Sequence, residues 1–255
     1  MRASQSGVSR YNSMQLTVER RFAQGFTARA NYTWSKSTDT MPVNWGAQGP
    51  MDSQSFVYPW YFPNADQMDR GLSDFDAKHR FVGSFVWQLP RMAHANPILR
   101  HAAGGWEATG LIALQSGPPL TISAGKDQSQ TSLRDRAVLN GTPNGAPYGP
   151  GACGSAAPCV DYLNVSSFGL PATGAFGNVG KGLLRGPNLM NVDAGFSKNI
   201  PLRERVQLQL RGEFFNFFNR ANFNNPNSSA SGGGFGSIRG AGDPRIGQLV
   251  IKLLF

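Results

Sequence analysis

Residues 206–214 read Val-Gln-Leu-Gln-Leu-Arg-Gly-Glu-Phe, so apolar and polar side chains alternate along this stretch. Successive side chains of a β-strand point to opposite faces of a sheet, and strict alternation therefore indicates a strand with two unlike faces. One face would carry Val206, Leu208, Leu210 and Phe214. A sheet that separates hydrocarbon from water needs this division, so the stretch predicts a strand that faces lipid on one side.

Six other segments alternate in the same way and predict six more strands. They are Tyr11–Arg21, Phe26–Trp34, Arg80–Leu89, Trp106–Gln115, Leu189–Lys198 and Arg245–Phe255. Strands of about 9 to 11 residues can cross a bilayer at a tilt, whereas soluble sheets use strands of about 5 to 6 residues. Further side chains expected to face lipid are Met14, Leu16, Val18, Tyr32 and Trp34.

The connections between these strands alternate between short and long. Short or intermediate connections are Ala23–Gly25, Pro90–Gly105 and Ile200–Glu204, and long ones are Ser35–His79, Ser116–Asn188 and Arg220–Pro244. Outer-membrane barrels have short periplasmic turns and long external loops. We therefore predict an all-β fold: a partial, antiparallel, up-and-down transmembrane β-barrel of about seven strands with long external loops.

Bacterial barrels of this kind have an even number of strands, with both chain ends on the periplasmic side. Seven strands that end in the periplasm would begin outside the cell. We therefore expect at least one more strand upstream, and we assign residues 1–255 to the C-terminal part of a larger barrel, without a plug domain.

Composition excludes several other classes of protein. Only 15% of the residues are charged and 40% are hydrophobic, yet no apolar run reaches the about 18 to 20 residues of a membrane-spanning helix. The net charge of +9 comes from scattered basic residues that form no run or helical stripe, so nucleic acid is not an expected partner.

The two short hairpins predict which polar residues meet across strands. A three-residue turn at Ala23–Gly25, with Gly25 in the left-handed region, would place Phe22 opposite Phe26. Two opposite-charge pairs would then face the barrel lumen. They are Glu19 with Arg29 and Asp193 with Arg211.

Two loop features suggest further sites. Cys153 and Cys159 are the only cysteines and would form a loop disulfide in an oxidising compartment, or else remain two free thiols. Aromatic residues crowd the stretch Pro42–Pro63 and either contact a ligand or only fold the loop on itself. The candidates for ligand contact are Trp45, Tyr58, Trp60 and Tyr61.

The sequence contains no catalytic motif, and we expect neither an enzyme nor a bound metal or cofactor. His79, His94 and His101 lack the spacing of a hydrolytic zinc site. An acidic group could bind calcium but lacks the EF-hand spacing, and the alternative is a solvated loop in which Asp74 and Asp76 cap turns or pair with Lys78 and Arg80. The acidic residues are Asp66, Asp69, Asp74 and Asp76.

The end of the chain resembles the C-terminal insertion signal of outer-membrane proteins, in which apolar residues alternate up to a terminal aromatic residue. Those residues are Leu249, Ile251, Leu253 and Phe255. Longer stretches resemble TonB-dependent transporters of the Oar-like kind, which carry a carboxypeptidase-regulatory-like domain. The matching stretches are Tyr11–Arg21, Asn31–Lys36, Arg70–Phe81 and Arg211–Pro226.

This resemblance implies a barrel of about 22 strands, a plug domain, and energy supplied through the TonB complex. It also implies contact with outer-membrane lipid, insertion by the barrel assembly machinery, and uptake of a small-molecule or peptide substrate that the sequence does not identify. The alternative is a non-transporting outer-membrane barrel that serves adhesion or surface architecture. A soluble secreted β-protein is a third possibility, and it would stay monomeric and fold in water without detergent.

Overall fold

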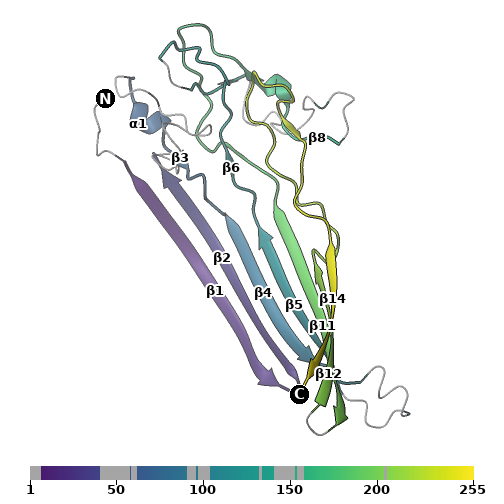
Figure 1. The fold of residues 1–255 in the computed structure, drawn as a ribbon. Coiled ribbons are helices and arrows are strands. Elements are labelled where there is room, and N and C mark those ends of the chain that lie inside the picture. The colour runs from purple at the N-terminus through teal and green to yellow at the C-terminus, as the bar shows by residue number, and fades with distance from the viewer. Residues whose placement is uncertain are drawn as a thin grey trace.

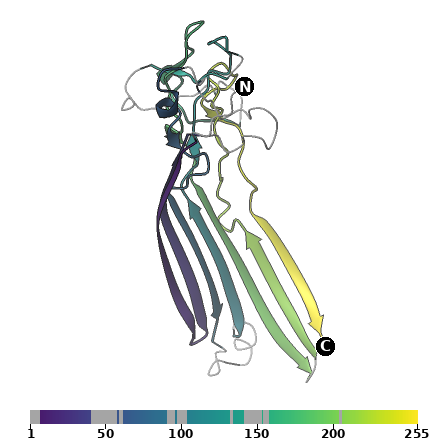
Figure 2. The same cartoon turned by 90° about the vertical axis from the view of Figure 1, so that its left-hand side faces the viewer.

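The computed structural model describes residues 7–40, 58, 62–90, 96, 104–131, 134–140, 153, 158–203 and 206–255. Seven long strands form one antiparallel sheet in which each strand pairs with its neighbours along the chain (Figure 1). They are β1 (Ser9–Ala23), β2 (Phe26–Asp39), β4 (His79–Gln88), β5 (Trp106–Gln115), β11 (Leu189–Arg203), β12 (Val206–Phe215) and β14 (Ile246–Leu254). The sheet is curved but open, because β1 and β14 remain its two edges in the described part of the chain (Figure 2).

The remaining elements are short and lie in the long connections, which gather at one end of the sheet (Figure 1). They are α1 (Ala65–Met68), β3 (Gly71–Leu72), β6 (Pro119–Leu120), β7 (Val138–Leu139), β8 (Val160–Asp161), η1 (Val165–Ser167), β9 (Phe168–Gly169), β10 (Leu184–Arg185) and β13 (Ser237–Ile238). Among the described residues, no helix has the length and hydropathy that crossing a membrane requires. The all-β meander that the alternation predicted is confirmed.

The first hairpin is tighter than the predicted three-residue turn. Ala23 pairs with Phe26, so only Gln24 and Gly25 form the turn. Both have positive φ, 53° and 79°, which fits the two-residue turns that match the twist of a hairpin. The predicted pairing of Phe22 with Phe26 is therefore wrong. An irregularity between Arg20 and Ala23 absorbs the extra residue and leaves Glu19 opposite Arg29 as predicted.

The second short hairpin differs more from the prediction. Strand β11 continues to Arg203, beyond the expected loop start at Ile200, and β12 begins at Val206. The resulting register places Arg211 opposite Ser197, so the predicted pairing of Arg211 with Asp193 is wrong. Alternation could not have revealed the error, because a register shift by an even number of residues keeps every side chain on its face.

The register joins the apolar positions of all seven strands into one face. Directly opposite residues share a side of the sheet, as Tyr32 does with Leu16 and Phe81. We define the apolar face by Met14, Leu16, Val18, Ala30, Tyr32, Trp34, Phe81, Phe85, Trp87, Ile112, Leu114, Met190, Val192, Phe196, Val206, Leu208, Leu210, Phe214, Leu249, Ile251 and Leu253.

The opposite side of the sheet is mainly polar. We define the polar face by Gln15, Thr17, Glu19, Arg29, Asn31, Thr33, Arg80, Ser84, Glu107, Thr109, Asn191, Asp193, Ser197, Gln207, Gln209, Arg211, Glu213, Gln248 and Lys252. A few apolar residues such as Val82, Leu111 and Val250 interrupt it. The division into two unlike faces nevertheless extends from β1 to β14.

Candidate functional site

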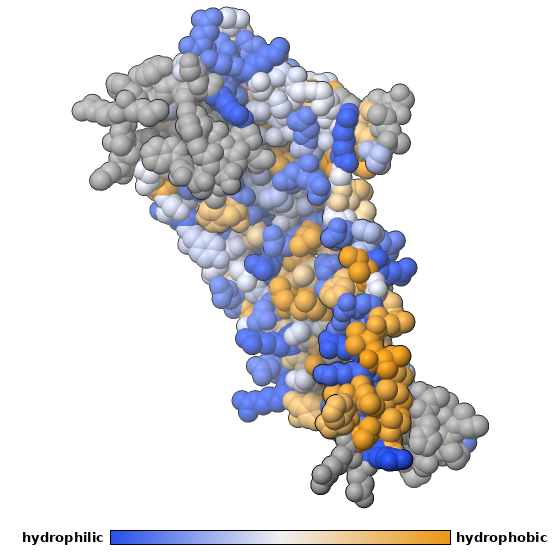
Figure 3. All heavy atoms as spheres, in the orientation of Figure 1, coloured by the Kyte–Doolittle hydropathy of each residue, from blue (hydrophilic) through white to orange (hydrophobic). Residues whose placement is uncertain are grey.

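The apolar face is a candidate surface for contact with lipid. Leu249 is 84% exposed and Ile251 is 74% exposed, and Phe255 after the last strand is 97% exposed. Hydrophobic side chains gather where β12 and β14 run, away from the loops (Figure 3). A soluble monomer rarely exposes an apolar patch of more than a few hundred Å², and here seven neighbouring strands contribute to one patch.

The height of the apolar face fits a bilayer. Strand β4 has 10 residues and therefore extends about 33 Å along its axis. A tilt of about 40° from the membrane normal reduces this length to about 25 Å, which is the height of the apolar band on outer-membrane barrels.

Two basic residues on the apolar face, Arg20 and Lys198, have aromatic partners. Near the first turn, the guanidinium of Arg20 lies 5.3 Å from the centre of the Phe26 ring. At the same end, Lys198 donates a 2.7 Å hydrogen bond to the Gly104 carbonyl, and its ammonium lies 5.6 Å from the Trp106 ring. Long basic side chains can extend toward polar groups and aromatic rings in this way, which lowers the cost of a charge on the apolar face.

The polar face carries hydrogen-bonded and charged groups that suit a water-filled lumen. Glu213 forms an ion pair with Arg211 and accepts a hydrogen bond from Gln248. Asp193, predicted to pair with Arg211, instead accepts a 2.9 Å hydrogen bond from the backbone N–H of Asn216. Each of these contacts joins residues of one strand, residues of two paired strands, or a strand residue and the residue just after a strand. The polar groups named here are therefore satisfied by near neighbours on the sheet.

The described residues of the long connections, within the ranges 40–78, 116–188 and 216–245, form a second structural unit, which we call the loop lobe. The second and third connections share a hydrophobic core and a short antiparallel pair between β8 and β13. Within the core, the Phe168 and Phe235 rings meet edge to face at 5.9 Å. The core residues are Leu120, Ile122, Ala137, Leu163, Phe168, Val179, Leu184 and Phe235. The second and third connections therefore form a hydrophobic core that is separate from the sheet and excludes water.

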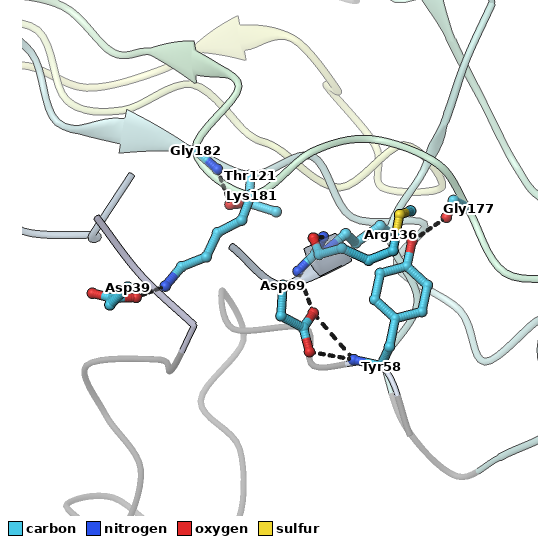
Figure 4. Close-up of polar contacts among 9 residues, drawn as sticks. Asp39, Tyr58, Asp69, Thr121, Arg136, Gly177, Lys181 and Gly182 are labelled. Carbon is cyan, nitrogen blue, oxygen red and sulfur yellow. Dashed lines mark hydrogen bonds and ion pairs between the residues drawn. The ribbon is translucent and has the colours of Figure 1, made fainter. Parts of the chain in front are cut away.

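Ion pairs connect the second connection to the first connection and to the end of β2. Arg136 pairs with Asp69 at 2.7 Å, Lys181 pairs with Asp39 and Arg185 pairs with Asp76 (the first two in Figure 4). The side chains of the first two pairs are almost completely buried, as is that of Asp76. Because unpairing a buried charge is costly, these pairs constrain how the two connections dock.

Arg136 makes several contacts in this interface. Its guanidinium also donates to the Met68 carbonyl at 2.7 Å and lies 5.0 Å from the centre of the Tyr58 ring. The backbone N–H of Tyr58 donates to both Asp69 oxygens, and the Tyr58 hydroxyl donates to the Gly177 carbonyl (Figure 4). Burial raises the pKa of Tyr58 and lowers the pKa of Arg136, although the neighbouring Asp69 opposes the second shift.

The loop lobe lies against the polar side of the sheet. At the external end of β2, Ser35, Ser37 and Asp39 are buried, whereas Trp34 and Lys36, whose side chains point to the other side of the sheet, are exposed. Asp76 accepts a hydrogen bond of 2.5 Å from the Ser37 backbone N–H. The lobe therefore packs against the polar side at the end of β2, whereas Leu189, Phe215 and Ile246 on the same side and at the same end of β11, β12 and β14 stay exposed.

Other predicted site residues have varied surroundings. Cys153 and Cys159 form a disulfide. Tyr58 of the aromatic loop is buried and stacks on Phe62 at 4.9 Å, so its ring contacts the protein interior. Trp45, Trp60 and Tyr61 lie outside the described residues, as do His94 and His101.

The acidic residues of the first connection do not form one cluster. Asp69 and Asp76 pair with different basic residues, and the described parts of the chain contain no group of three or more potential metal ligands of the His, Cys, Asp or Glu type. Of the two roles expected for Asp76, ion pairing with Lys78 or Arg80 is wrong, because its ion-pair partner is Arg185; its carboxylate also accepts a hydrogen bond from the Ser37 backbone N–H.

Sequence patterns did not indicate the ion-pair partners in the loop lobe. Arg136, Lys181 and Arg185 lie in segments without alternation, 67, 142 and 109 residues from their respective partners. No local pattern distinguishes these basic residues from neighbouring ones such as Arg134.

Comparison with known proteins gives one match. The sequence model of one protein family, described as an outer membrane beta barrel domain, matches residues 2–248. No curated protein and no solved structure matches the chain.

Proposed function

The chain belongs to the outer membrane beta barrel domain family, and from this membership we propose that it forms wall and external loops of a TonB-dependent transporter of the Oar-like kind. The family places the protein in the bacterial outer membrane, where the apolar face contacts lipid. Residues 1–255 would be the C-terminal part of the transporter barrel. The substrate would be a small molecule or peptide.

The position of the loop lobe is the observation that carries this proposal. The lobe packs against the polar side at the end of β2, where Ser37 and Asp39 are buried, and it has a hydrophobic core and buried ion pairs. A transporter must control access from outside to a polar lumen, and ordered loops over its mouth can provide that control. The four stretches that resemble Oar-like transporters, which begin at Tyr11, Asn31, Arg70 and Arg211, support the same assignment.

The open edges of the sheet also support a larger barrel. Strands β1 and β14 each lack a neighbour on one side among the described residues. Hydrocarbon cannot satisfy unpaired backbone N–H and C=O groups, so a membrane-spanning sheet needs closure. We propose that additional strands of the same transporter pair with both edges. The alternating residues from Leu249 to Phe255 would present β14 to the barrel assembly machinery.

A non-transporting barrel for surface architecture is the second candidate. The compact loop lobe favours it, because a folded lobe at the external end could also contact other cells or surfaces. Such a barrel would need no energy from the inner membrane. Dependence on TonB therefore distinguishes the two functions experimentally.

Binding to TonB tests the transporter proposal. The gene product, expressed from its native locus and purified in mild detergent, is expected to bind the purified periplasmic domain of TonB from the same bacterium. Cells without TonB should retain the protein in the outer membrane but lose the uptake that this protein provides. If the protein does not bind TonB, and if loss of the gene and loss of TonB affect different uptake activities, the transporter proposal is wrong and surface architecture is favoured.

A further inference from the structure

Basic side chains line the external end of the apolar face. On β1 and β2, Arg10 lies opposite Thr38 and Lys36 lies opposite Asn12. These positions are in the same alternation as Met14 and Trp34, so both basic side chains are on the lipid side of the sheet. Arg10 and Lys36 are both exposed and, as diagonal neighbours, about 7 to 8 Å apart in backbone position.

Two more basic residues lie at the external end of the opposite edge of the sheet, next to β12 and β14. Arg220 follows β12, is exposed, and donates a 2.9 Å hydrogen bond to the sulfur of Met190, which is on the apolar face. Arg245 is exposed and immediately precedes β14, where its backbone N–H donates to Asn219 at 2.9 Å. We call Arg10, Lys36, Arg220 and Arg245 the cationic rim.

The positive charge of the rim has little compensation on its own side of the sheet. At the external end, Asp39, Asp69 and Asp76 are buried in or under the loop lobe and pair with other cations. No ion pair among the described residues involves a member of the cationic rim. An exposed acid, Asp243, lies two residues before Arg245 and offsets part of the charge.

We propose that the cationic rim binds the phosphate groups of anionic lipid headgroups in the outer leaflet. The apolar face lies in the hydrocarbon, so side chains at its external end lie at the level of the headgroups. Arginine is suited to this contact because its planar guanidinium can bind two oxygens of one phosphate. This inference depends on the outer-membrane location and is independent of transport.

Lipid binding by the full chain in neutral detergent micelles tests the proposal. The probes are lipid A with its phosphate groups, the same lipid after dephosphorylation, and inorganic phosphate as competitor. The test variant combines Arg10→Gln, Lys36→Gln and Arg245→Gln. A matched control removes the same charge from the polar face through Arg29→Gln, Arg80→Gln and Lys252→Gln.

Each Lys or Arg near an anionic lipid surface contributes about fivefold in affinity, so the test variant should bind phosphorylated lipid about 100-fold more weakly at low salt. Its binding of dephosphorylated lipid should not change, and the control variant should bind both lipids as the parent does. A charge-keeping variant with Arg10→Lys, Lys36→Arg and Arg245→Lys should restore most of the binding, which excludes a folding defect.

Any one of three results would overturn the inference: equal binding of both lipids by the parent, an equal loss of affinity in the control and test variants, or displacement of the phosphorylated lipid by millimolar inorganic phosphate. If the parent binds neither lipid, both the headgroup-binding role of the cationic rim and the lipid-facing assignment of the apolar face are wrong. None of these results depends on TonB, so they are distinct from a failure of the transporter proposal.

Discussion

Replacing Ile112 with arginine is expected to destabilise the membrane-inserted protein by about 2 to 4 kcal/mol, the cost of a basic side chain near the middle of a bilayer. Ile112 lies on the apolar face of β5, between Gly83 of β4 and Val192 of β11. It is three residues from the end of its strand, and its two cross-strand partners carry no polar group. An arginine there can reach the interface only by bending past apolar neighbours.

The neighbouring residue supplies the matched control. Ala113 lies on the other side of the same strand, opposite Val82 and Asn191, where an arginine would face the lumen. Ala113→Arg is expected to cost much less than Ile112→Arg. Reversible urea unfolding from lipid vesicles would compare the two free energies of unfolding. An equal or larger loss for Ala113→Arg would show that β5 does not face lipid through Ile112.

Replacing Arg136 with methionine is expected to open the interface between the first two connections of the loop lobe. The substitution leaves the carboxylate of Asp69 buried without its cation, and breaking a buried ion pair in this way costs about 3 to 5 kcal/mol. It also removes the guanidinium from the face of the Tyr58 ring. Hydrogen exchange should accelerate at residues 62–76 and 134–140, while the seven long strands keep their protection.

Two further variants make this expectation specific. Arg134→Met removes an exposed arginine from the same segment and should leave exchange unchanged. Combining Arg136→Met with Asp69→Leu removes both charges and should recover part of the loss, since apolar replacements of a buried pair can be neutral. If Arg136→Met and Arg134→Met behave alike, the Arg136 pair does not hold the two connections together.

The strands were predictable because lipid and water impose a two-residue period on every spanning segment. That period located all seven long strands and assigned residues such as Leu210 and Ile251 to the same face, where they lie directly opposite each other. It did not give the register of β11 and β12, because any even shift preserves the period. The extra strand residues up to Arg203 were therefore assigned to a loop.

The loop lobe was not predictable for a different reason. Its interior is formed by residues from distant segments, such as Phe168 and Phe235, and no local repeat links them. Its ion pairs were also hidden, because a lone Lys181 in a glycine-rich segment looks like any surface lysine. The aromatic loop illustrates the difficulty, since Tyr58 was a candidate for ligand contact and is instead buried against Arg136.

Spin-label accessibility along β12 is the most direct test that one side of the sheet faces lipid and the other faces water. Single nitroxide labels would be placed at each position from Gln207 to Phe214 in the protein reconstituted in bilayers. Collisions with dissolved oxygen should peak at Leu208, Leu210, Gly212 and Phe214, and collisions with a water-soluble nickel complex should peak at Gln207, Gln209, Arg211 and Glu213. Uniform accessibility along the strand, or peaks in the opposite phase, would contradict the membrane assignment.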